Sequence, residues 1–148
     1  MTAANRPKTR SSLADDPQIH RRIFDAVADG LLIVDPEVGN VIEANAAACV
    51  MHGYACDDLV GRPLASILHP SSASFLEDCQ RAALAGVDWK ARCLHARRDG
   101  STFHAEWRGT AFEVEGRPCL LASVRDISPQ VQTETALEFL APLLAWQD

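Results

Sequence analysis

Two cysteines and a histidine near the middle of the chain are the first candidates for chemistry. Cys49 and His52 are three residues apart in a stretch whose pattern predicts a helix, so both side chains can face one side, and Cys56 follows. A histidine beside a thiol lowers the thiol pKa and can make the sulfur a nucleophile. One alternative is therefore a small enzyme that uses a Cys49/His52 thiol, although no third residue that would orient the histidine stands out.

The cysteines as a set are more typical of a packed interior than of a reactive centre. They number five, include no C-x-x-C pair, and lie at positions 49, 56, 79, 93 and 119. This spacing indicates neither a zinc site nor a disulfide framework. We expect small buried side chains, no metal site and no catalytic set, so the chain is not predicted to be an enzyme.

A second polar set alternates along one predicted strand. His104, Glu106 and Arg108 stand two residues apart, which places their side chains on the same face. Together they could orient a polar group of a ligand. The favoured interpretation is the solvent-facing side of an antiparallel sheet.

The composition indicates one soluble domain. Of 148 residues, 47% are hydrophobic and 23% are charged, and a net charge of −6 argues against binding along nucleic acid. No apolar run approaches the roughly 20 residues needed to cross a bilayer, and the basic start of the chain lacks the apolar stretch of a signal peptide. We expect a cytoplasmic protein without membrane insertion, whose partner is a small molecule or a protein.

The first part of the chain predicts a flexible leader, a flanking helix and a hairpin. Residues 1–15 are polar and without periodicity, whereas Asp16 followed by Pro17 is typical of a helix start. The flanking helix is expected within 16–29, with one apolar face formed by Ile19, Ile23 and Val27. Two short apolar runs around a Gly-Asn pair at 39–40 then predict a β-hairpin.

Short helices and a three-stranded meander follow. Residues 46–51 have a helical pattern, and a capping box at Ser74 and Glu77 predicts the start of a longer helix that ends at Gly86. Hairpin turns separate three predicted strands, at 89–97, 102–114 and 118–127. The end of the chain, 129–148, predicts an amphipathic output helix that is interrupted at Pro142.

Four motifs follow one another along the chain. They are Gly30 to Asp35 (GLLIVD), Ile42 to Asn45 (IEAN), Gly53 to Gly61 (GYACDDLVG), and Arg98-Asp99-Gly100 followed by Val124 to Ser128 (VRDIS). In this order they resemble the PAS domain, a sensory module of bacterial signalling proteins. The resemblance implies an α+β fold with a five-stranded antiparallel sheet, short helices packed on one face, and flanking amphipathic helices. The PAS domain would span residues 30–128. One departure is Ala55, which stands where PAS domains commonly have a serine or threonine cap.

The resemblance also bears on cofactors. Arg62 and Pro63 follow Gly61 where the light-sensing type has its flavin-reactive cysteine, and residues 72–86 lack the histidine of the oxygen-sensing haem type. His69 is the only plausible haem ligand, and the stretch from Trp89 to Gly100 has a weaker likeness to flavin-binding redox PAS domains. We expect no cofactor, with flavin and haem as alternatives.

The apolar residues between the helices and the sheet predict a ligand pocket. Its lining would favour a small apolar or aromatic molecule, and the candidates are Ile33, Val50, Leu59, Leu64, Ile67, Phe75, Leu94, Trp107, Leu121 and Ser123. An equally weighted interpretation is that these side chains fill the core, which would leave a purely structural dimerisation domain.

The exit from the last strand predicts a signal relay. Asp126-Ile127-Ser128 matches the Asp-Ile-Thr exit motif of PAS domains, where strand becomes output helix. Val131, Leu137 and Leu140 beyond it, with the apolar face of the leading helix, predict a homodimer. The function expected is a regulatory module that binds a small ligand or protein and relays a change to an effector such as a histidine kinase, cyclase or transcription regulator.

Overall fold

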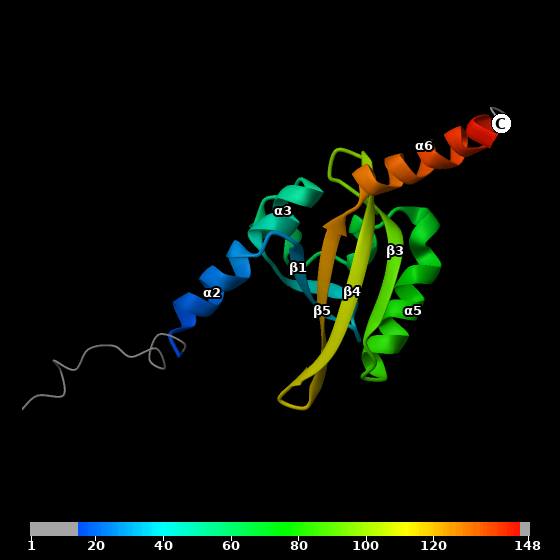
Figure 1. Cartoon of the computed structure of the whole chain (residues 1–148). Coiled ribbons are helices and arrows are strands. Elements are labelled where there is room, and N and C mark those ends of the chain that lie inside the picture. Colours follow the sequence, from blue (N-terminus) through cyan, green and yellow to red (C-terminus); the bar gives the residue numbers. More distant parts are fainter. Residues whose placement is uncertain (1–14, 146–148) are drawn as a thin grey trace, which may run out of the picture.

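The computed structural model describes residues 15–145, an α+β domain with a projecting helix at each end (Figure 1). Its helices and strands are α2 (Pro17–Ala26), β1 (Gly30–Asp35), β2 (Asn40–Ala44), α3 (Ala46–His52), α4 (Cys56–Leu59), η2 (Leu64–Ile67), η3 (Pro70–Ser72), α5 (Ala73–Leu84), β3 (Trp89–Ala96), β4 (Thr102–Val114), β5 (Arg117–Asp126) and α6 (Ser128–Ala145). The expected leader, 1–15, lies outside the described residues except for Asp15, as do residues 146–148.

The strands form one five-stranded antiparallel sheet in the order β2-β1-β5-β4-β3. The first strand pairs with the last, and Leu32 of β1 stands opposite Ala122 of β5. The three C-terminal strands begin and end within one residue of the predicted 89–97, 102–114 and 118–127. Because β5 is central and continues into α6, a change within the sheet has a direct covalent path to the terminal helix.

Strand alternation separates a buried face of the sheet from a solvent-facing one. The short helices and α5 cover the buried face, and on β4 the residues that face them are Phe103, Ala105 and Trp107 (Figure 1). The same alternation puts Leu120, Ala122 and Val124 of β5 on this face. One continuous hydrophobic core results, with Leu32, Leu59, Leu64, Ile67, Phe103 and Trp107 all at most 2% exposed.

Asn45 joins three elements at the entrance to the core. Its Oδ1 accepts hydrogen bonds from the amides of Leu31 (2.8 Å) and Ala48 (2.9 Å), so it caps α3. Its Nδ2 donates to the carbonyls of Phe24 (2.9 Å) and Asp29 (3.1 Å). The side chain is fully buried, and it ties α2 and β1 to the first turn of α3.

The predicted capping box at Ser74 and Glu77 is wrong. The helix α5 begins at Ala73, one residue before Ser74, and its N-cap residue Ser72 makes no side-chain cap. The Ser72 hydroxyl instead exchanges hydrogen bonds with the backbone of Leu94 on β3 at 3.2 Å. A tertiary contact therefore replaces the local one that the motif suggested.

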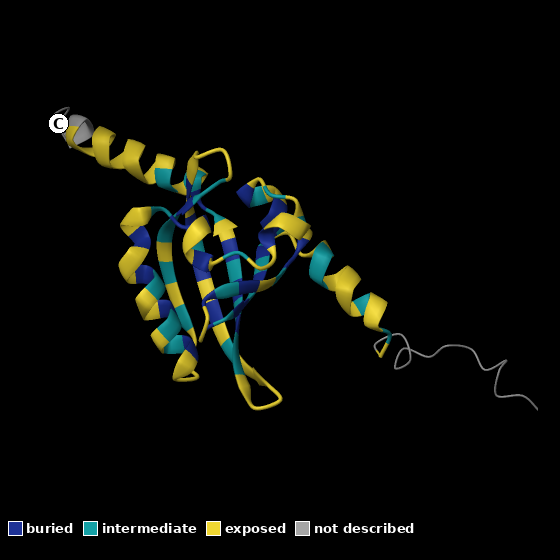
Figure 2. Cartoon of the chain, turned by 180° about the vertical axis from the view of Figure 1, so that it is seen from behind, coloured by how far each residue is buried: buried dark blue, intermediate teal, exposed yellow. Residues whose placement is uncertain are grey.

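The predicted interruption at Pro142 is also wrong, because α6 continues through it to Ala145. Proline removes one backbone donor, and the carbonyl that loses its partner, that of Glu138, lies on an exposed residue and can bond water. Both terminal helices are largely exposed and extend away from the sheet (Figure 2).

Candidate functional site at the junction of sheet and terminal helix

The Asp126-Ile127-Ser128 segment forms a hydrogen-bonded joint between β5 and α6. The Asp126 carboxylate accepts a hydrogen bond from the Ser128 amide at 2.9 Å, and the Ser128 hydroxyl accepts one from the His104 amide at 3.1 Å. Ile127 is 2% exposed, and its amide donates to the His104 carbonyl at 2.9 Å. The first turn of α6 is thus held by a side chain at the end of one strand and by the backbone of its neighbour.

Arg97 connects this joint to the helices on the other side of the β3–β4 turn. Its guanidinium lies 3.6 Å from the Asp126 carboxylate, and its Nε donates to the carbonyl of Met51, in the last turn of α3, at 3.2 Å. The guanidinium also donates to the Thr102 carbonyl and lies over the Phe103 ring, 4.6 Å from its centroid. One side chain therefore touches both α3 and the residue that caps α6.

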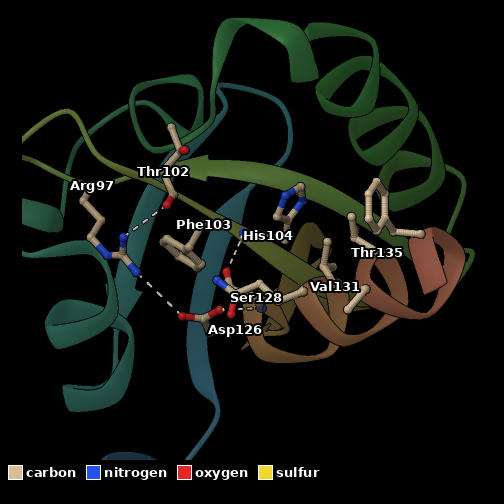
Figure 3. Close-up of a pocket in the computed structure, with 11 residues that line it drawn as sticks. Arg97, Thr102, Phe103, His104, Asp126, Ser128, Val131 and Thr135 are labelled. Carbon is tan, nitrogen blue, oxygen red and sulfur yellow. Dashed lines mark hydrogen bonds and ion pairs between the residues drawn. The ribbon is translucent and has the colours of Figure 1, made fainter.

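An open groove runs along the joint, with a volume of about 860 Å³ (Figure 3). Arg97 and Asp126 face each other across one end, while Val131 and Thr135 of α6 border the other. The lining is mixed, because aromatic side chains of the sheet and helix, Phe103 and Phe139, lie beside these polar groups. A molecule bound here would contact the strand end and the helix together.

Behind the groove, two histidines form a buried hydrogen-bonded pair. His52 Nδ1 lies 2.7 Å from the Ala48 carbonyl, and His52 Nε2 lies 2.8 Å from His95 Nδ1. The carbonyl can only accept, so His52 carries its proton on Nδ1, its Nε2 accepts, and His95 donates from Nδ1. His95 Nε2 is then a buried lone pair, and it has no hydrogen-bond partner among the described residues.

Burial keeps both imidazoles neutral. Desolvation lowers the pKa of His95 to about 3, with a further lowering from His52, and it lowers the pKa of His52, assisted by the positive charge of Arg97. The centroids of both imidazole rings lie 5.3 Å from the centroid of the Phe103 ring. The Arg97 guanidinium lies over the same Phe103 ring. The histidine pair, Phe103 and Arg97 are therefore one packed unit.

The structure contradicts the prediction that Cys49 and Cys56 are separate, free cysteines. They form a disulfide between α3 and α4, with Cα atoms 5.4 Å apart, whereas Cys79, Cys93 and Cys119 are free. A Cys49/His52 nucleophile is absent from this state, because the sulfur is bonded and both His52 nitrogens already have partners. The spacing of seven residues suggested no pairing because the contact depends on the reversal of direction at Gly53.

Comparison with known proteins identifies this architecture. The sequence matches the PAS fold family over residues 19–127, which is most of the chain. The chain belongs to the PAS family. PAS domains are sensory domains of signalling proteins, and the five-stranded sheet and helices of this PAS domain agree with that fold.

The curated relatives are larger proteins. A protein of Azorhizobium caulinodans without an assigned function is 31% identical over 127 residues, and the diguanylate cyclase DgcM of Escherichia coli K12 is 28% identical over 133 residues. Each alignment covers 82% of this chain but only 17% and 30% of the two relatives, respectively. The PAS domain thus spans less than a third of either relative.

Solved structures with the same fold include the PAS domain of an HTR-like protein from Haloarcula marismortui. It is 26% identical, with a TM-score of 0.69 over 79% of this chain and 96% of that chain. An RNA-binding light-oxygen-voltage receptor shares the fold with a TM-score of 0.74 at 21% identity, over 93% of this chain and 41% of that chain.

Half of the predicted pocket residues lie in the core of the PAS domain. Their side chains converge between the helices and the buried face of the sheet, and none exceeds 8% exposure: Leu59, Leu64, Ile67, Phe75 and Trp107. Phe75 packs against Trp107 edge to face, with ring centroids 5.3 Å apart. Their part in binding a ligand stays a prediction.

The other five predicted pocket residues are wrongly placed. Val50 is 81% exposed, because α3 turns Ala48, Cys49 and His52 inward. The remaining four lie on strands but point to the opposite face of the sheet, one position out of step with the buried residues beside them: Ile33, Leu94, Leu121 and Ser123. On continuous apolar strands such as 31–34, a one-residue shift in phase cannot be detected from composition.

The polar set of β4 lies on the solvent-facing side of the sheet, as favoured. Glu106 and Arg108 line a small cleft there with Asp29, Ser123 and Arg125. Arg125 pairs with Asp29 at 3.3 Å. The acidic and basic side chains of this cleft neutralise one another and do not point together at one place where the polar group of a ligand could bind.

His69 is positioned as a structural residue. Its Nδ1 lies 2.7 Å from the Ser71 hydroxyl and accepts from the Ser71 amide at 3.1 Å, which caps the short helix η3. Within residues 15–145, no group of three His, Cys, Asp or Glu side chains is arranged to hold a metal ion. In the same range, no helix is long and apolar enough to span a membrane.

Two members of the site were not singled out from the sequence. They are Arg97, which directly precedes the Arg98-Asp99-Gly100 motif, and His95, which lies within the predicted strand 89–97. His95 and His52 are 43 positions apart, and no local pattern links them. The charged run Arg97-Arg98-Asp99 at a hairpin turn was the one available signal, because tandem arginines at a turn can reach two elements at once.

Proposed function

We propose that this PAS domain is a cytoplasmic regulatory module that passes a change in its ligand-covering helices to α6, and through α6 to an effector. The observation that carries the proposal is the position of Arg97. Its guanidinium binds the Met51 carbonyl of α3 and pairs with Asp126, the residue that caps α6. A displacement of α3 would therefore change the anchoring of the terminal helix.

Buried polar atoms support a small ligand with an apolar body and a polar group. The Trp107 indole N–H, like His95 Nε2, lies in the core without a hydrogen-bond partner among the described residues. An unsatisfied buried polar atom costs about 1–3 kcal/mol, so a molecule that bonded either atom would gain that energy. Phe75 and Trp107 would supply its aromatic contacts.

Exposed apolar side chains on both terminal helices support a homodimer. Ile23 of α2 is 56% exposed, and Leu137 and Phe139 of α6 are 62% and 75% exposed. Such side chains are normally covered by a partner when several lie together on one helix. The likeness to DgcM favours a cyclase among the possible effectors, with histidine kinases and transcription regulators as alternatives.

We propose neither an enzyme activity nor a resident cofactor. The second candidate function is a redox or gas sensor with bound flavin or haem. An absorption spectrum of the purified protein separates these, because a flavin or Soret band would favour a redox or gas sensor.

The experiment that tests the proposal combines native mass spectrometry with hydrogen exchange. We expect the purified protein to carry a non-covalent molecule, or to show a raised Tm with one member of a library of small aromatic compounds. Addition of that compound should change exchange at the first turn of α6. Binding of a compound without a change in exchange at α6 would contradict the relay. If the purified protein carries no molecule and no compound of the library raises its Tm, the proposal that the domain binds a small ligand is contradicted.

A further inference from the structure

The disulfide between Cys49 and Cys56 bridges the two short helices that cover the N-terminal half of the sheet. Cys49 is 3% exposed, whereas Cys56, at the start of α4, is partly exposed. Of the two residues, Cys56 is therefore the one that an attacking thiol can approach. In a reducing compartment, disulfides are generally transient, catalytic or redox-sensing rather than permanent.

The helix α4 has few other attachments. It has only four residues, and its N-cap residue, Ala55, makes no side-chain cap. Besides the disulfide, its contacts include the buried side chain of Leu59 and the ion pair between Asp58 and Arg98 at 3.0 Å. Just after the helix, the Gly61 amide donates to the Val41 carbonyl of β2 at 2.7 Å. The disulfide is the covalent link between α4 and α3, whereas these other contacts join α4 to the core, to the β3–β4 turn and to β2.

The same two helices are bound by the two arginines of the β3–β4 turn. The Arg98 amide donates to the His52 carbonyl of α3 at 2.9 Å, while its guanidinium pairs with Asp58 of α4. Arg97, next to it, binds the Met51 carbonyl and pairs with Asp126. A change in the relative position of α3 and α4 would therefore disturb the contacts of both arginines. Arg97 is the one that pairs with Asp126, the residue that caps α6.

We propose that Cys49 and Cys56 form a thiol–disulfide exchange site, whose substrate is a small or protein-borne dithiol and whose redox state controls how firmly α4, and through the turn arginines α6, is anchored. The coupling to α6 rests on the proposed function. The exchange site itself does not.

The chemistry balances as a two-electron exchange. A thiolate of the reductant attacks Cys56 Sγ, a bond forms between these sulfurs, and the bond between Cys49 and Cys56 breaks with its electron pair left on Cys49 Sγ, which takes up a proton. The second thiolate of the reductant then attacks the reductant sulfur that is bonded to Cys56. The bond to Cys56 breaks, and Cys56 leaves as a thiolate that takes up a proton. The protein gains two electrons and two protons, and the dithiol becomes a disulfide.

The free thiols of the core do not compete in this exchange. Cys79 and Cys93 face the interior from α5 and β3, and burial raises the pKa of each to about 12. At neutral pH such thiols are almost entirely protonated and are poor nucleophiles. Neither of these two thiols is therefore expected to attack the disulfide between Cys49 and Cys56.

The test uses the whole chain equilibrated in dithiothreitol buffers of graded reduced to oxidised ratio. Alkylation after denaturation should count three thiols at the oxidised end and five at the reduced end, from the five cysteines of the sequence. Hydrogen exchange at the Leu59 and Val60 amides should become at least about tenfold faster on reduction, with a smaller rise at Arg98 and in the first turn of α6.

Two variants sharpen the result. Cys56→Ser should show the fast hydrogen exchange of the reduced protein at every ratio. Cys119→Ser, which removes a free cysteine of β5, should keep the wild-type hydrogen exchange and count two thiols at the oxidised end and four at the reduced end. Five alkylated thiols at the oxidised end, or equal exchange of α4 in both redox states and in Cys56→Ser, would overturn the exchange site. A response confined to α4 would support the site and overturn the relay to α6, so the two failures are distinct.

Discussion

His52 and His95 share a hydrogen bond of 2.8 Å between Nε2 and Nδ1, and both side chains are fully buried. This bond requires at least one neutral ring, and desolvation keeps both neutral. A second proton would leave two cations in contact inside the core. The pair therefore makes the fold sensitive to pH as well as rigid.

The pH dependence of stability follows from this pair. Both histidines have a pKa lowered by folding, so the unfolded chain binds more protons and stability falls as pH drops below about 6.5. For His95, whose pKa falls to about 3, the loss between pH 7 and pH 5 is about 2 kcal/mol. Urea unfolding at the two pH values measures it.

The matched controls are His95→Gln and His104→Gln. The first should flatten the dependence on pH, while the second, which changes an exposed histidine on the other face of the sheet, should keep the wild-type slope. Equal slopes in all three proteins would contradict the assignment to the buried pair.

Asn45→Ala is expected to lower the free energy of unfolding by about 3 kcal/mol, because it leaves the amides of Leu31 and Ala48 without their acceptor in a buried position. Chemical denaturation measures the change. Asn40→Ala, on the edge strand β2, should cost less than about 1 kcal/mol. A similar cost at the two positions would show that Asn45 is not the tie between α2, β1 and α3.

Thiol reactivity should follow burial. At pH 8, iodoacetamide should label Cys119 first, because burial raises the pKa of Cys79 and Cys93 to about 12 and leaves these two side chains almost no thiolate. Peptide mapping over time measures the three rates. Labelling of Cys93 as fast as Cys119 would contradict the raised pKa of Cys93.

Much of the fold could be predicted from the sequence because local signals set it. Asn45, Gly53 and the hairpin turns determine where elements end, and the three C-terminal strands fall within one residue of the prediction. What failed was long-range. The face to which Leu121 and Ser123 point depends on pleat phase, and the bonds between His52 and His95 and between Cys49 and Cys56 depend on how α3 packs on β3 and α4.

The proposed dimer predicts that Leu137→Glu weakens self-association, because a charge would replace an exposed apolar side chain on α6. Size-exclusion chromatography with light scattering should give a dimeric mass for the wild type and a monomeric mass for the variant. Val114→Glu, which replaces another exposed apolar side chain, in the β4–β5 hairpin, is the control and should remain dimeric. A monomeric wild type at high concentration would refute the dimer.

The relay depends on Arg97 joining α3 to the cap of α6, and Asp126→Asn tests it most directly. The amide oxygen of asparagine can still accept from the Ser128 amide, so the variant weakens the ion pair with Arg97 while it keeps the cap. Asp29→Asn, which weakens the nearby ion pair with Arg125, is the control.

Residue-resolved hydrogen exchange by NMR is the deciding measurement. Because coupling between sites is reciprocal, Asp126→Asn should speed exchange at the Val131 amide of α6 and also at the Arg98 amide bound to α3, each by about two- to fivefold for a partly exposed pair. A change confined to α6, or the same pattern in Asp29→Asn, would contradict the account.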